Sequence, residues 1–210
     1  MNIGILGGGN VGGALGTGWA RKGHKIRYGV RKPDSPQMLE VLRQIGAAAS
    51  AGSVPEAATF GEVIVLATPW PAVQDVLKSA GDLSGKVLLD CINPLKPDLS
   101  GLAIGSTTSA GEMVAGWVPG ARVVKIFNTT GAGNMANPAY PVGPVTMFYC
   151  GDDPGAKIVA AQLASDLGFE PVDSGPLINA RLLESLAMLW IWMAVFGGTG
   201  HNFAFKLIRR

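Results

Sequence analysis

The chain has 210 residues and a formal net charge of +2 at pH 7, with 48% hydrophobic and only 15% charged residues. This composition argues against a disordered chain, and the small net charge argues against a partner such as nucleic acid. Thirty glycines among so many apolar residues suit a parallel sheet covered by helices on both faces. The length allows one large domain, or one domain with a small second lobe.

The chain carries no predicted targeting or anchoring segment. The apolar strand expected at residues 2–6 follows Met1 directly, without a basic stretch, so we expect no secretory signal. Residues 186–196 are apolar, but a spanning helix needs about 20 residues, so this segment is predicted to be buried or partner-facing. Cys91 and Cys150 lie in apolar runs without metal-ligand spacing. We therefore expect a cytoplasmic protein with two free, buried thiols and no membrane insertion.

The first motif is a glycine loop between the strand at 2–6 and a helix predicted at 11–22. Its spacing is G-x-G-x-x-G, in which Gly7 allows a tight turn, Gly9 lets backbone amides approach a pyrophosphate, and Gly12 lets the helix pack closely on the strand. The spacing alone also fits a structural turn. Its place between a strand and a helix favours a dinucleotide site.

The second predicted strand, 25–30, ends in basic residues that bear on the choice of cofactor. Dinucleotide folds that bind NAD carry an acidic residue here for the ribose 2′-hydroxyl, whereas an Arg accommodates the 2′-phosphate of NADP. This chain has Arg31 and Lys32, with Ser35 close behind and no acid before Asp34. A solvated basic face is the alternative, since residues 21–43 hold seven Lys or Arg against two acids. The position at the strand end favours NADP.

Three further strands are predicted at 62–67, 86–92 and 122–127, and each ends in a polar or turn-forming segment. These are Thr68-Pro69-Trp70, Asn93-Pro94-Leu95 and the loop 128–134. Ligands of open parallel sheets bind outside the carboxyl ends of the strands, so these segments are candidate ligand contacts. Ordinary loop structure is the alternative for each of them.

Helical segments are expected between these strands, and a second strand–helix series closes the chain. The helices are predicted at 37–45, 72–80 and 106–118, with a short helical turn at 54–58. The closing series has strands at 144–150 and 169–172, a helix at 154–167 and the apolar helix ending at Phe196. We predict an α/β fold, a Rossmann-type doubly wound and mainly parallel sheet in residues 1–135, with a small carboxyl-terminal α/β lobe in 136–210. The last helix is apolar nearly all round, which favours a homodimer.

Few side chains suit acid–base or metal chemistry. The only histidines are His24, in a turn away from the predicted crevice, and His201, in the glycine-rich tail. We find no cluster with metal-ligand spacing, no G-x-S-x-G motif and no P-loop lysine. Hydride transfer is the reaction class that remains, because in such enzymes the cofactor carries the reactive group and the protein only has to orient it. We therefore assign no catalytic side chain and no metal.

Several motifs together resemble the deazaflavin-dependent NADP oxidoreductases, and the resemblance covers nearly the whole chain. They are Gly7-Gly8-Gly9-Asn10-Val11-Gly12, Arg31, Thr68-Pro69-Trp70, Cys150-Gly-Asp-Asp153 and, most specifically, Asp173-Ser-Gly-Pro-Leu-Ile-Asn-Ala-Arg-Leu-Leu-Glu-Ser185. The resemblance implies hydride transfer between NADPH and the deazaflavin coenzyme F420, usually by a dimer. The same motifs also resemble the cytoplasmic domain of six-transmembrane ferric reductases, which donate hydride to a flavin.

The resemblance also implies positions for the cofactors. It places the pyrophosphate on Gly8, Gly9, Asn10 and Val11, and the 2′-phosphate near Arg31 and Ser35. Thr68, Pro69, Trp70 and Asn93 would flank the ribose and nicotinamide, while Thr130 and Ala132 would lie near the face of hydride transfer. Archaeal deazaflavin enzymes carry a His-Thr pair where this chain has Asn128-Thr129. This difference falls where the deazaflavin would stack.

Other interpretations remain open from the sequence. The protein could be a dehydrogenase of a small substrate, or an NADP-binding redox sensor without turnover. Trp190, Trp192 and Phe196 could stack on a flavin, although core packing or a dimer interface is the commoner use of such a helix. Arg181 and Glu184 are three residues apart and could form a structural ion pair.

Overall fold

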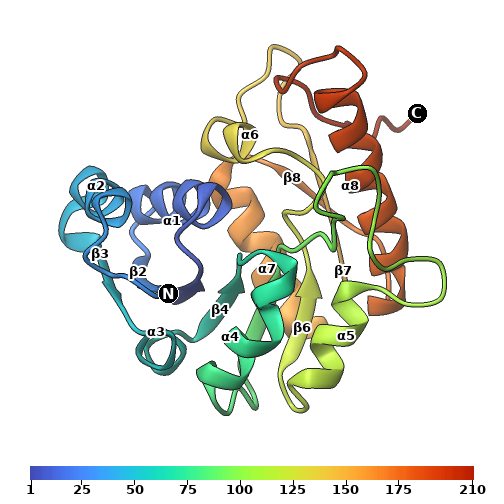
Figure 1. Ribbon diagram of the computed structural model, residues 1–210. Helices are drawn as coiled ribbons and strands as arrows, with labels where there is room; N and C mark the ends of the chain where they lie inside the picture. The colour runs from blue at the N-terminus through green and yellow to red at the C-terminus, as the bar shows by residue number, and fades with distance from the viewer.

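The computed structural model describes all residues 1–210 and contains one sheet of eight strands. The sheet order is β3-β2-β1-β4-β5-β6-β7-β8 (Figure 1). The strands are β1 Asn2–Leu6, β2 Lys25–Gly29, β3 Ala49–Gly52, β4 Val63–Leu66, β5 Val87–Asp90, β6 Arg122–Lys125, β7 Thr146–Gly151 and β8 Glu170–Asp173. The α-helices are α1 Asn10–Arg21, α2 Pro36–Ile45, α3 Val54–Phe60, α4 Val73–Ala80, α5 Ala110–Trp117, α6 Ala132–Ala136, α7 Pro154–Leu167 and α8 Ala180–Val195. Single 3₁₀ turns are η1 Gly46–Ala48, η2 Trp70–Ala72 and η3 Leu177–Asn179.

The first six strands pair in parallel in the order 3-2-1-4-5-6, which confirms the Rossmann-type fold. The order reverses between β1 and β4, so a crevice is expected at the carboxyl ends of these strands. β7 runs antiparallel to β6, and β8 pairs in parallel with β7. The same sheet thus includes strands from both sides of the predicted boundary at residue 135. The division into residues 1–135 and 136–210 stays a prediction.

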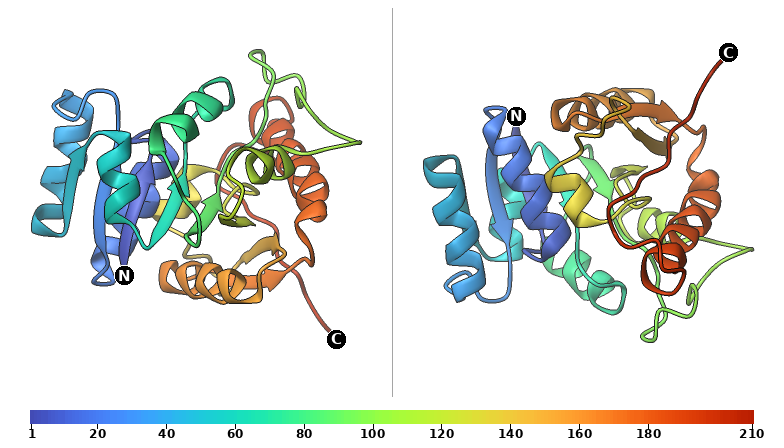
Figure 2. Two further views of the ribbon diagram at one scale, coloured as in Figure 1. Left: turned by 90° about the horizontal axis from the view of Figure 1, so that it is seen from below. Right: turned by 90° about the horizontal axis from the view of Figure 1, so that it is seen from above.

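Helices cover both faces of the sheet. Neighbouring residues of each strand point to opposite faces, and both faces carry apolar side chains that need cover. Ile3 and Ile5 belong to the core cluster beneath α1 and α7, whereas Leu6 belongs to the cluster beneath α3, α4 and α5. Figure 2 shows α7, in orange, and α4, in green, on opposite sides of the strands. The Trp19 indole donates to the Leu163 carbonyl at 2.9 Å, which joins α1 to α7. The sheet is therefore enclosed between two layers of helices.

Two elements lie where the sequence predicts none. β3 reads Ala-Ser-Ala-Gly and forms an edge strand, and α6 occupies part of the segment predicted as the loop 128–134. β3 has no apolar run or alternation that would mark a strand. It is defined by its pairing with β2, such as Ile26 with Ala49.

The last helix is longer than the apolar stretch in the sequence suggests. Together η3 and α8 form a helix of 19 residues, Leu177–Val195, with a mean hydropathy of 1.3. By length and composition it could cross a membrane, as core helices of many proteins could, so the argument from shortness was wrong. Here one side of α8 packs on α5 and β7, and the helix lies at the outer edge of the fold (Figure 1). The absence of membrane insertion stays a prediction.

Candidate dinucleotide site

The glycine loop at the end of β1 is shaped by two close backbone approaches. Gly7 has a φ of 120°, and a Cβ there would lie 2.4 Å from the Ala67 carbonyl oxygen. A Cβ on Gly12 would lie 2.1 Å from the Gly7 carbonyl oxygen. A larger residue at position 7 would push the loop away from the end of β4, and one at position 12 would push α1 away from the loop. The structural roles expected of Gly7 and Gly12 are therefore confirmed.

The helix start behind this loop is open. Gly9 is the N-cap residue of α1, and a Cβ there would meet no atom within 4 Å. No side chain caps the helix, and its first turn carries no acidic residue. The unpaired amides and the positive end of the helix dipole suit an anion such as a pyrophosphate. Gly8 packs on α2, since a Cβ there would lie 2.7 Å from the Met38 methyl carbon.

Arg31 and Lys32 follow β2 as exposed side chains without an ion-pair partner. Two other basic residues of the same region are paired, Arg27 with Glu56 at 3.0 Å and Arg43 with Glu40 of its own helix. The Ser35 hydroxyl caps α2 by accepting the Met38 amide at 3.4 Å. Two free cations thus lie beside a helix start at the end of β2.

Thr68, Pro69 and Trp70 follow β4 at the same edge of the sheet. The Thr68 hydroxyl is buried and has no hydrogen-bond partner in the protein. Pro69 is exposed, and the Trp70 ring stacks on Trp117 of α5, with centroids 5.6 Å apart and an interplanar angle of 22°. Packing therefore engages the Trp70 ring, and its contact with a cofactor stays a prediction.

Asn93 and Asn128 join the ends of β5 and β6. Asn93 Nδ2 donates to the Asn128 carbonyl at 2.8 Å, and Asn128 Nδ2 donates to Asn93 Oδ1 and to the Leu183 carbonyl, both at 3.1 Å. Phe127, fully buried, has a φ of 59°, a strained conformation that turns the chain just before Asn128. Asn128 Oδ1 is left buried without a partner. Asn128 was not among the predicted cofactor residues.

Thr130 lies two residues before α6, and Ala132 is the first residue of that helix. Asn134 of this helix donates to Thr130 Oγ1 at 2.9 Å and to the Phe203 carbonyl at 2.8 Å. Between them, Gly131 packs directly on Trp190, because a Cβ there would lie 2.5 Å from the indole ring. The carboxyl-terminal tail thus holds this loop from outside.

The aromatic residues of α8 divide into a buried one and exposed ones. Trp190 stacks on Phe203, with centroids 5.1 Å apart, and its indole donates to the Phe203 carbonyl at 2.9 Å. Trp192 and Phe196 are 54% and 53% exposed. Trp190 is therefore a packing residue beneath the loop, as the commoner interpretation held.

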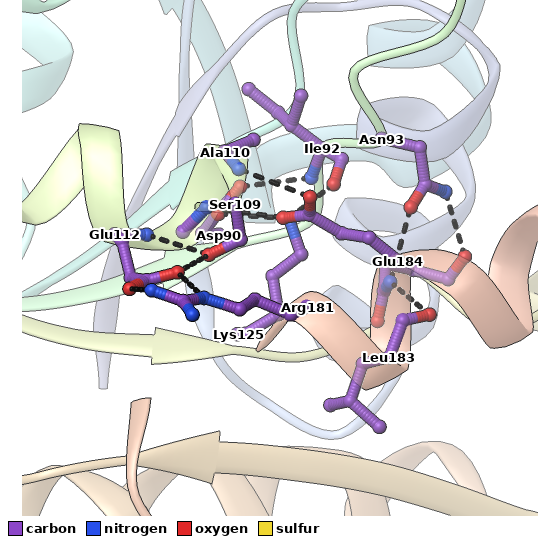
Figure 3. Close-up of polar contacts among 12 residues, drawn as sticks. Asp90, Ile92, Asn93, Ser109, Ala110, Glu112, Lys125, Arg181, Leu183 and Glu184 are labelled. Carbon is purple, nitrogen blue, oxygen red and sulfur yellow. Dashed lines mark hydrogen bonds and ion pairs between the residues drawn. The ribbon is translucent and has the colours of Figure 1, made fainter. Parts of the chain in front are cut away.

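A buried charge cluster lies under the ends of β5 and β6. Lys125 Nζ is 3.0 Å from Asp90 and 2.9 Å from Glu184, and it also donates to the Ile92 carbonyl (Figure 3). Burial lowers the pKa of the Lys125 ammonium, but the two carboxylates outweigh this effect and the pKa lies above its ordinary value. Lys125 is therefore charged. A lysine and an aspartate inside apolar strands were the sequence signals for this cluster.

Glu184 does not pair with Arg181, so that expectation was wrong. Arg181 forms two hydrogen bonds with the Glu112 carboxylate of α5, at 2.8 and 2.6 Å. Glu184 instead accepts the first amides of α5, from Ala110 at 3.0 Å and Gly111 at 3.1 Å. The two side chains are three apart in the sequence, but the fold offers each a partner on another element.

His24 lies far from this edge, as expected. Its ring bonds Asp166 of α7 at 3.0 Å and the amino terminus at 3.3 Å. Cys91 and Cys150 are free and buried, which confirms that prediction. A hollow of about 540 Å³ between residues 100–106 and α8 contains none of the predicted cofactor residues.

The glycine loop, the open helix start and the basic strand end are those of a Rossmann-type dinucleotide-binding oxidoreductase. A family model described as NADP oxidoreductase, coenzyme F420-dependent, matches residues 2–94. A crystal structure of a putative F420-dependent NADP reductase from Arthrobacter sp. FB24 shares 32% identity and superposes with a TM-score of 0.89, covering 100% of both chains. The chain belongs to the family of F420-dependent NADP oxidoreductases and is an NADP-dependent oxidoreductase.

Two curated relatives extend the comparison. The F420-dependent NADP reductase of Methanothermobacter thermautotrophicus is 29% identical over 205 residues, which are 91% of this chain and 88% of that protein. Metalloreductase STEAP3 of Rattus norvegicus is 30% identical over 192 residues, 89% of this chain. The chain spans only 36% of the length of that metalloreductase.

The residues present fit NADP. The glycine loop leaves a space that a Cβ would fill, the first amides of α1 have no side-chain cap, and Arg31 and Lys32 have no protein partner. Further along the same edge, Thr68 Oγ1 and Asn128 Oδ1 are buried polar atoms that lack a partner. Open amides, free cations and unpaired polar atoms are the kinds of group that hold, respectively, the pyrophosphate, the 2′-phosphate and the nicotinamide end of such a cofactor.

Proposed function

We propose that the protein transfers a hydride between NADP(H) and a deazaflavin or flavin-like acceptor bound beside the nicotinamide. The observation that carries the proposal is the uncapped start of α1 behind the glycine loop, followed at the next strand end by unpaired Arg31 and Lys32. A helix start that binds one phosphate group, next to two cations that bind another, suits a dinucleotide with a third phosphate on its ribose.

In this proposal each part of the carboxyl edge holds one part of NADP. The amides of Gly8, Gly9, Asn10 and Val11 bind the pyrophosphate, while Arg31 and Lys32, with the Ser35 hydroxyl, bind the 2′-phosphate. Thr68 and Asn93 face the ribose and nicotinamide, and the segment of Thr130 and Ala132 borders the acceptor. The bound nicotinamide supplies the hydride chemistry, so the chain needs only to hold, orient and dry the two reactants.

Coenzyme F420 is the acceptor that the relatives favour. Two of them carry F420-dependent NADP reductase in their names, and they align over nearly the whole chain. The related metalloreductase makes a flavin or a ferric chelate the second choice. Asn128 of this chain, whose side chain faces Asn93, lies at the position where the acceptor would stack.

We also propose that the protein is a cytoplasmic homodimer. The outer side of α8 and its flanks presents large apolar side chains to solvent, and a second copy of this chain would cover them. The residues are Ile178, Leu182, Leu189, Trp192, Val195 and Phe196.

Anaerobic mixing with NADPH and oxidised F420, followed by absorbance of the deazaflavin, tests the function. We expect F420 reduction, and the reverse reaction with NADP⁺ and reduced F420. Parallel reactions with flavin and with a ferric chelate identify a different acceptor. Tight NADPH binding with no reduction of any of these would overturn the enzyme and leave the redox-sensor interpretation.

A further inference from the structure

We propose that the buried cluster of Lys125, Asp90 and Glu184 is a positioning device for the nicotinamide half of the crevice. It acts through the strand ends that carry Asn93 and Asn128. The inference rests on the proposed function and adds to it three residues that contact no cofactor. Figure 3 shows Lys125, Asp90 and Glu184 converging under Ile92 and Asn93.

Sheet register brings the first two charges together. Asp90 and Lys125 are paired neighbours on the parallel strands β5 and β6, and each is the last residue of its strand. Both are fully buried on the face that α5 and α8 cover. The ion pair therefore closes the sheet just before the two chain segments leave it for the crevice.

The same two side chains hold the backbone of the next segment. Asp90 Oδ1 accepts the Ile92 amide at 2.9 Å, and Lys125 Nζ donates to the Ile92 carbonyl. Both polar backbone groups of Ile92 are thus bonded to the cluster. The following residue is Asn93, so the cluster sets the direction in which Asn93 leaves β5.

One turn of α8 reaches both strand ends. Glu184 contacts Lys125 at 2.9 Å, and the preceding residue, Leu183, accepts Asn128 Nδ2 at 3.1 Å. Asn128 in turn bonds Asn93. A shift of this turn would move Asn93 and Asn128 together, because both depend on adjacent residues of one helix.

Stability alone is a weak reason for this cluster. A buried ion pair often stabilises a fold no more than well-packed apolar residues of similar volume would. The attachment of α8 to α5 has a second, more exposed ion pair, Arg181 with Glu112. Besides the bonds of Glu184 to the first amides of α5, the buried cluster adds the bonding of Ile92, and through it the geometry of the nicotinamide end.

The test compares two ligands that share the adenine half of NADPH. Adenosine 2′,5′-bisphosphate has the 2′-phosphate but no nicotinamide, so its affinity reports the Arg31 end alone. For Glu184→Gln we expect the Kd of NADPH to rise about tenfold, with the Kd of the bisphosphate unchanged. The isosteric Gln leaves Lys125 paired with Asp90. Arg181→Gln, on the same helix and also facing α5, is the matched control and should change neither Kd.

A second variant, Asp90→Asn, keeps the size of the side chain and leaves Lys125 paired with Glu184; it should give the same selective loss. Circular dichroism melting of each variant shows that a folded protein is compared. An unchanged ratio of the two Kd values in both variants overturns the positioning role, and so does an equal loss of both ligands. If the unaltered protein binds neither ligand, the proposed function fails first, and the inference fails with it.

Discussion

Asn93 and Asn128 hold each other through two hydrogen bonds, one from each side-chain amide, at 2.8 and 3.1 Å. The first reaches the Asn128 backbone and the second the Asn93 side chain, so the ends of β5 and β6 are joined in a defined direction. Asn128 Nδ2 is further bonded to α8, while its Oδ1 stays buried without a partner. An unpaired buried polar atom costs about 1–3 kcal/mol, and Asn128 Oδ1 is free to accept a hydrogen bond from a bound ligand.

Arg31→Asp should discriminate between the two nicotinamide cofactors. The exposed Arg31 has no protein partner whose loss would affect folding, and the new carboxylate would repel a 2′-phosphate. We expect the Kd of NADPH to rise by about two orders of magnitude or more, corresponding to about 3 kcal/mol, while that of NADH changes little. Fluorescence titration with both cofactors measures the effect. Equal weakening of both would show that Arg31 does not bind the 2′-phosphate.

Gly9→Ala should lower affinity without lowering stability. A Cβ at this position meets no protein atom within 4 Å, and the φ of −77° suits any residue. The methyl group would instead occupy the space proposed for the pyrophosphate. Thermal melting should stay within a few degrees of the unaltered protein, while NADPH binding weakens at least about tenfold.

Gly13→Ala is the matched control for this prediction. Its Cβ would make an ordinary contact, 3.8 Å from a Val41 methyl carbon of α2. Alanine also favours a helix by about 1 kcal/mol over glycine. Unchanged NADPH affinity in Gly9→Ala would place the pyrophosphate elsewhere.

The pair of Glu112 and Arg181 should make the stability of the fold depend on acid. The Arg181 guanidinium holds the pKa of the Glu112 carboxyl below its ordinary value of 4.5. The pair therefore contributes stability above pH 4.5 and loses it as the pH falls through the lowered pKa of Glu112. Glu112→Gln should cost about 1 kcal/mol at neutral pH and flatten the loss of stability in acid. Denaturant unfolding at a series of pH values measures both; an unchanged acid dependence would contradict the assignment.

The two thiols should be inert in the folded protein. Burial raises the pKa of Cys150 to about 12 and also raises that of Cys91, so neither supplies thiolate at neutral pH. A thiol reagent such as dithiobisnitrobenzoate should react slowly with the native protein and with both cysteines once guanidinium unfolds it. Rapid labelling of the native protein would show that one of these segments opens.

Segments with a periodic apolar pattern, or bounded by glycine or proline, were predictable because these signals lie within a few residues of one another. The strand at 2–6, the glycine loop and the helix behind it follow one another within a few residues, and the fold shows each of them in place. β3 was not predictable, since Ala-Ser-Ala-Gly has no β-strand pattern and depends on the exposed edge of β2 for its pairing. The predicted partner of Arg181 was wrong for a related reason. Helical spacing indicated Glu184, whereas in the fold Arg181 pairs with Glu112, which is 69 positions away in the sequence.

The sequence by itself determined the Rossmann-type sheet, the glycine loop and the basic end of β2. These depend on apolar runs and on glycine positions, which act over short stretches of chain. Only the tertiary structure decided how the nicotinamide end is built. Lys125 is the last residue of β6, Asn128 follows shortly after it and Glu184 lies on α8, and the sequence of neither segment shows which partner its side chains will meet. Their burial in one place makes unpaired polar groups costly, and that cost selects the specific partners that the fold brings together.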